Sequence, residues 1–88
     1  MSFSAHKRDA LDESMLIAHR MSHLRSCAVL VSEKYNVPRS EVVNRIKSSC
    51  GVNIEEPQSN SDIQRVIEVL TLMKTSGLET IATHDRPL

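Results

Sequence analysis

The stretch from Asp9 to Tyr35 contains no proline and no glycine, and this constrains the fold more than any other feature of the sequence. Apolar residues recur in it at helical spacing, in alternating steps of four and three residues from Ile17 onward. The series is Ala10, Ile17, Met21, Leu24, Ala28, Val31 and Tyr35. A continuous helix of this length would be about 40 Å long. We therefore predict a long first helix that either bends near residues 22–26 or packs against a second copy of the chain.

Two shorter helices are predicted in the second half. The first should begin at Pro38 or Arg39 and end before Gly51, because proline suits the first turn of a helix and glycine its C-terminal cap. The second should open at Ser61 with a capping box, end at Gly77 and carry an apolar stripe between them. The stripe consists of Ile63, Val66, Ile67, Leu70 and Met73.

These elements predict an all-α fold, a small bundle of three main helices in a single domain of residues 1–88, with flexible termini at 1–8 and 84–88. Phe3 and Tyr35 are the only aromatic residues. Such a small, aromatic-poor core often gains stability by oligomerising, so we predict a homodimer through the first and last helices. The residues expected in the core or the dimer interface are Ile17, Met21, Leu24, Ala28, Val31, Ile63, Val66, Ile67, Leu70 and Met73.

Composition narrows the class of protein further. No apolar run approaches the roughly 20 residues that span a membrane, and the N-terminus lacks a signal-peptide pattern. Two cysteines, Cys27 and Cys50, are too few for a secreted disulfide scaffold. We therefore expect a cytoplasmic protein. The net charge is zero, but residues 20–50 hold six basic and two acidic side chains, so the middle of the chain is locally basic.

The segment 31–46 reads as the end of one helix, a corner at 36–38 and the start of another. Asn36 tolerates the left-handed conformation that such a corner needs. Over residues 28–47 the sequence resembles the helix-turn-helix of small bacterial and phage repressors. It departs from the usual sequence of that motif at three positions, where Ser32 replaces alanine, Asn36 replaces glycine and Pro38 replaces the capping serine.

The resemblance implies binding of double-stranded DNA and transcriptional control by the second helix of the motif. Carried onto this sequence, Arg39 and Arg45 would read guanine and Asn44 would read adenine. The remaining implied contacts are to the phosphate backbone. They come from Ser40, Lys47, Lys34 and Arg25.

Other chemistry is less well supported by the residue pattern. His19, His23 and Cys27 are spaced four apart, but ligands at i and i+8 lie about 12 Å apart on a straight helix, so we expect surface histidines and no metal. No glycine-rich phosphate loop and no activated nucleophile is recognisable. We expect no enzymatic activity and no cofactor.

The rival function is a protein-binding module that acts without DNA, as an inhibitor or adaptor of a larger complex. It is suggested by broad apolar faces that include Met15, Met21 and Met73, because methionine adapts to irregular partners.

Overall fold

The computed structural model describes residues 2–56 and 59–78, and within them it is entirely helical. The helices are α1 (Phe3–Ala10), α2 (Ile17–Lys34), α3 (Arg39–Cys50) and α4 (Asn60–Ser76). The all-α prediction is confirmed, and residues 2–56 and 59–78 contain four helices where three main helices were expected. No helix in the described ranges is long and apolar enough to cross a membrane.

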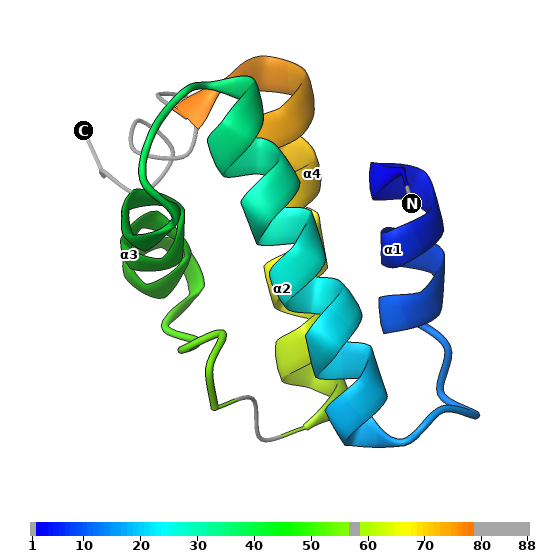
Figure 1. Ribbon diagram of the computed structural model, residues 1–88. Helices are drawn as coiled ribbons and strands as arrows, with labels where there is room; N and C mark the ends of the chain where they lie inside the picture. Colours follow the sequence, from blue (N-terminus) through cyan, green and yellow to red (C-terminus); the bar gives the residue numbers. More distant parts are fainter. Residues whose placement is uncertain (1, 57–58, 79–88) are drawn as a thin grey trace.

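α2 is the central element of the bundle. α1 runs antiparallel along one side of it, α4 lies behind it and runs in the same direction, and α3 crosses it steeply on the other side (Figure 1). The whole measures 39 × 24 × 19 Å along its principal axes. Because α2 contacts all three other helices, it is the scaffold on which the rest of the chain is arranged.

The predicted long helix is not continuous, and it is interrupted at residues 11–16 and not near residues 22–26, which lie within α2. The chain leaves the helix after Ala10 and re-enters it at Ile17. In between, the Asp12 carboxylate accepts hydrogen bonds from the Ser14 backbone N–H at 3.0 Å and from its hydroxyl at 2.6 Å. This local turn offers the backbone an alternative to the helical ladder. It forms without proline or glycine, so apolar spacing alone did not indicate it.

The N-terminal residues fold back on α2 as a helix of their own, where a flexible start was expected. Ser2 caps α1 by accepting a hydrogen bond from the Ala5 N–H at 3.2 Å, and Phe3 is buried. Residues 3–8, expected as part of a flexible start, therefore form most of α1. The expected flexible tail at 84–88 lies outside the described residues.

The apolar stripe predicted along α2 packs against the other helices of the same chain. Most residues of the predicted core or dimer set are buried, namely Leu24, Ala28, Val31, Ile63, Val66, Ile67, Leu70 and Met73. Val42 and Ile46 of α3 and Ile54 of the following connection belong to the same core. The exceptions are Ile17, which is 43 % exposed, and Met21, which is half-buried. They lie on the first turns of α2, next to the break.

α2 and α4 are joined at both ends by polar contacts. At one end Arg20, only 3 % exposed, donates from Nε to the Ala10 carbonyl at 2.8 Å and from Nη2 to the Asn60 side chain at 2.5 Å. At the other end the Tyr35 hydroxyl donates to the Met73 carbonyl at 2.6 Å. The Met73 carbonyl also accepts the Gly77 N–H at 2.9 Å, so the hydroxyl is a second donor to it. These contacts fix the alignment of the two longest helices.

The boundaries of the last two helices follow the sequence closely. α3 begins at Arg39 directly after Pro38 and ends at Cys50, and Gly51 forms its C-terminal cap in the left-handed conformation with φ 75°. α4 ends at Ser76, and Gly77 forms its C-terminal cap as predicted. Its N-terminal cap was placed two residues too late, because Ser59 and not Ser61 accepts the Asp62 N–H at 3.2 Å.

Candidate nucleic-acid interface

The corner between α2 and α3 is built as its residues indicate. Asn36 is the one non-glycine residue with positive φ in the described ranges, at 54°, and Pro38 stands in extended conformation before α3. The Val37 N–H donates to the Ser32 carbonyl at 3.0 Å, which closes the turn. Tyr35 and Val37 pack against the core from inside the corner. The predicted corner at 36–38 is therefore present.

One face of α3 points to solvent and is wholly polar. Ser40, Asn44 and Lys47 are exposed and lie four and three residues apart, whereas Val42 and Ile46 are buried on the opposite face. Hydroxyl, amide and ammonium groups are able to bond base edges or phosphates. Three of the predicted DNA-binding residues thus share one outward surface, which we call the α3 face.

The two arginines expected to read guanine lie on the flanks of α3 and are engaged within the chain. Arg39 forms an ion pair with Glu55 of the connection that follows α3. Arg45 pairs with Glu41 one turn earlier at 2.7 Å and also donates to the Leu78 carbonyl at 3.3 Å. Sequence reasoning identified the cations but not these partners, although the i, i+4 spacing of Glu41 and Arg45 was a usable signal.

The four residues predicted to contact the phosphate backbone are divided among three places, and two of them, Ser40 and Lys47, lie on the α3 face. Lys34 donates from Nζ to the Lys74 carbonyl, so it serves as a cap for the C-terminus of α4. Arg25 projects from the middle of α2 into an open groove that Arg39 also lines. Arg25 and Arg39 therefore line one groove, whereas Lys34 lies at the C-terminus of α4.

This groove has a volume of about 640 Å³ and lies between α2, the N-terminus of α3 and the connection after α3. Its polar lining includes Ser22, Arg25 and Ser26 from α2 and His6 from α1, and Glu55 is the one acidic side chain among the described residues that line it. Arg25 and Arg39 bring two guanidinium groups to this groove, and that of Arg39 is paired there with the Glu55 carboxylate.

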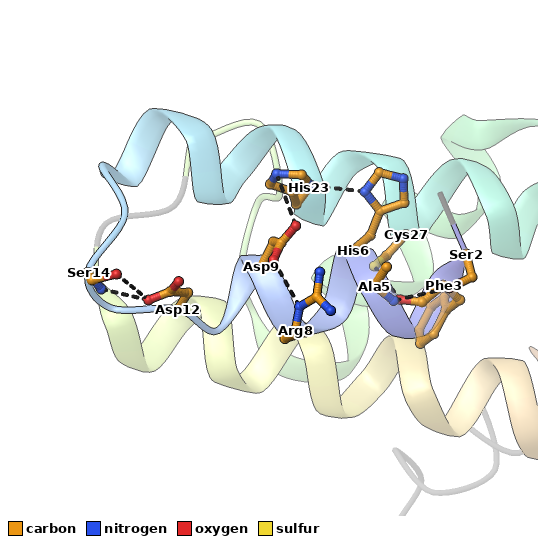
Figure 2. Close-up of polar contacts among 10 residues, drawn as sticks. All are labelled: Ser2, Phe3, Ala5, His6, Arg8, Asp9, Asp12, Ser14, His23 and Cys27. Carbon is orange, nitrogen blue, oxygen red and sulfur yellow. Dashed lines mark hydrogen bonds and ion pairs between the residues drawn. The ribbon is translucent and has the colours of Figure 1, made fainter.

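A second polar cluster joins α1 to α2 (Figure 2). The Nδ1 atoms of His6 and His23 lie 2.9 Å apart, and His23 Nε2 lies 3.8 Å from a carboxylate oxygen of Asp9. Burial, followed by the charge of His23, lowers the pKa of His6 below 6.5. A hydrogen bond between the rings requires one Nδ1 to carry a proton and the other to accept it. The cluster therefore favours a state in which the two rings are not both charged.

The predicted behaviour of the histidines holds only in part. His19 is exposed, but His23 is half-buried against α1. Cys27 is fully buried, and burial raises the pKa of its thiol to about 11, which keeps it protonated and a poor nucleophile. Among the described residues, no three His, Cys, Asp or Glu side chains gather closely enough to hold a metal ion.

Comparison with known proteins adds no identification. The sequence matches no protein-family model, and it has no significant match among curated proteins or solved structures.

Proposed function

We propose that the protein is a small DNA-binding transcriptional regulator in which α3 enters the major groove. The observation that carries this proposal is the α3 face, an outward surface of Ser40, Asn44 and Lys47 on a helix that follows a tight corner and is anchored by Val42 and Ile46. In a helix-turn-helix the second helix presents its N-terminal residues to base edges while the first crosses the backbone. Asn44 would read adenine, and Lys47 and Ser40 would bind guanine or phosphate.

The basic groove supports the same proposal. Arg25 and Arg39 line one groove that reaches the N-terminus of α3, and in this proposal a duplex seated on α3 would bring its sugar-phosphate backbone to them. Arg45 lies on the other flank of α3. We assign Arg25 and Arg39 to backbone phosphates in place of the base contact expected for Arg39 from the sequence.

We also propose that the regulator acts as a homodimer, because a single short recognition helix contacts few base pairs and repressors of this kind pair two half-sites. Since the stripe of α2 is used inside the chain, the contact surface has to lie elsewhere. The start of α2 is suitable, because Leu16 is 71 % exposed and Ile17 is exposed beside it.

Replacement of Asn44 tests the assignment of the α3 face. Asn44→Ala should weaken binding to a selected duplex by about 1–3 kcal/mol and relax the preference at one base pair, because an amide reads adenine bidentately. Gln64→Ala, which removes an exposed amide from α4, should leave affinity unchanged. Equal affinity of wild type and Asn44→Ala for that duplex, measured by fluorescence anisotropy, would remove Asn44 from the interface.

A protein-binding module that needs no DNA is the second candidate function. It is favoured by a groove of about 570 Å³ between α1 and α4, into which the exposed Leu72 and the partly buried Leu11 project. This function predicts that Leu72→Ser abolishes activity while neutral substitutions at Arg39 and Lys47 do not. DNA binding predicts the reverse pattern.

A further inference from the structure

Arg39, the first residue of α3, is held by a carboxylate from another part of the chain. Its guanidinium contacts the carboxylate of Glu55, sixteen residues later, in the connection between α3 and α4. Both side chains remain partly accessible, with 41 % of Arg39 and 46 % of Glu55 exposed. The contact therefore lies at the surface, at the edge of the proposed DNA interface, where a ligand is able to reach it.

The position of Glu55 is set by the backbone around it. Ile54 is fully buried and anchors the connection in the core. The Asn53 side chain accepts the Glu55 N–H at 3.0 Å, and the Asn53 carbonyl accepts the Glu56 N–H at 3.0 Å. These bonds form a compact turn of the kind that asparagine favours. Asn53 thus holds the backbone N–H groups of both Glu55 and Glu56, and the turn presents the Glu55 side chain toward Arg39 of α3.

The surroundings of this pair suit an anion other than Glu55. Arg25 lines the same groove from α2, and the hydroxyl of Ser22 lines it as well. A guanidinium binds carboxylate and phosphate oxygens with the same planar fork. A phosphodiester that took the place of the Glu55 carboxylate would therefore contact the Arg39 guanidinium in a groove that Arg25 and Ser22 also line.

We propose that Glu55 is an intramolecular competitor for DNA, a carboxylate that occupies Arg39 until a backbone phosphate displaces it. The inference rests on the proposed DNA binding and adds a regulatory element to that site. On binding, Arg39 exchanges the carboxylate for the phosphate, and Glu55 turns outward to solvent. Part of the attraction between DNA and Arg39 is spent on this exchange, so Glu55 lowers affinity.

The test compares Glu55→Gln with Glu56→Gln by titration of short random-sequence duplex DNA at low salt. Both variants remove one negative charge from adjacent exposed positions, so they change long-range attraction equally, and the Arg39→Ala background separates the release of Arg39 from the loss of the contact that Glu56 itself makes. Only Glu55→Gln releases Arg39. We expect it to bind about twofold to fivefold more tightly than Glu56→Gln, the range that an exposed ion pair supports. In an Arg39→Ala background that advantage should disappear.

The possible failures are distinguishable. If wild type binds DNA and the two glutamine variants bind equally, or if the advantage of Glu55→Gln survives in the Arg39→Ala background, the competitor role of Glu55 is overturned while DNA binding stands. If none of the proteins binds duplex DNA at low salt, the proposed function itself fails, and this inference fails with it.

Discussion

Arg20 is the residue whose surroundings depart furthest from what its chemistry favours. A charged side chain almost never lies fully buried unless it is well bonded. Arg20 meets this requirement with the Ala10 carbonyl and the Asn60 amide oxygen, and so ties the end of α1 and the start of α4 to α2. No pattern around residue 20 predicted this, because both partners lie in distant parts of the sequence.

Replacement of Arg20 should be costly. Arg20→Ala leaves a buried carbonyl without its donor and removes an aliphatic stem from the packing, so we expect a loss of about 2–4 kcal/mol in the free energy of unfolding. Arg65→Ala is the matched control, because Arg65 forms an exposed i, i+3 ion pair with Asp62 and should lose less than about 1 kcal/mol. Urea denaturation measures both. Equal losses in the two variants would mean that the buried contacts of Arg20 contribute little.

At the scale of elements, the sequence predicted α3 and α4 well and the N-terminal region poorly. Pro38, Gly51 and Gly77 mark helix ends through their own backbone preferences, which are local and therefore readable. The break at residues 11–16 depends on one side-chain turn made by Asp12. Ala10 and Ile17 continue the helical spacing across that break by coincidence, since they belong to different helices.

The packing of α1 on α2 should depend on pH. Because the pKa of His6 is lowered from 6.5 by burial and by His23, the folded protein binds this proton less readily than the unfolded chain. Well above pH 6.5 His6 is neutral in both the folded and the unfolded state, and this residue then costs no stability. As pH falls below 6.5 and through the lower pKa of the folded state, the unfolded chain takes up the proton first, so stability decreases.

Thermal unfolding between about pH 8 and about pH 5 measures this dependence. We expect the midpoint temperature to fall on acidification in wild type and to fall less in His6→Gln, which keeps a hydrogen-bonding side chain but does not titrate. His19→Gln serves as the control, because His19 is exposed on α2 and should keep the wild-type slope. Identical slopes for all three proteins would remove His6 from the account.

At the scale of the molecule, the sequence indicated which side chains of α3 face outward, but it did not indicate which charged side chains have partners within the chain. The alternation of buried and exposed positions along α3 follows from helical period, so Ser40, Asn44 and Lys47 were placed correctly on its surface. The contacts of Lys34 with α4 and of Arg39 with Glu55 join residues 40 and 16 positions apart. Such pairings arise only when the helices assemble, which is why the predicted site included cations with structural partners.

The central claim is that α3 of this bundle binds duplex DNA. Its most direct test is selection from a random-sequence duplex pool by the wild-type protein at low and at physiological salt, with sedimentation of the complex alongside. We expect enrichment of a two-fold-symmetric sequence with half-sites about one helical turn apart, a dimer on the DNA, and an affinity that falls steeply as salt rises. Failure to retain any duplex at low salt would contradict the claim. The helix–corner–helix of α2 and α3 would then have a structural role only.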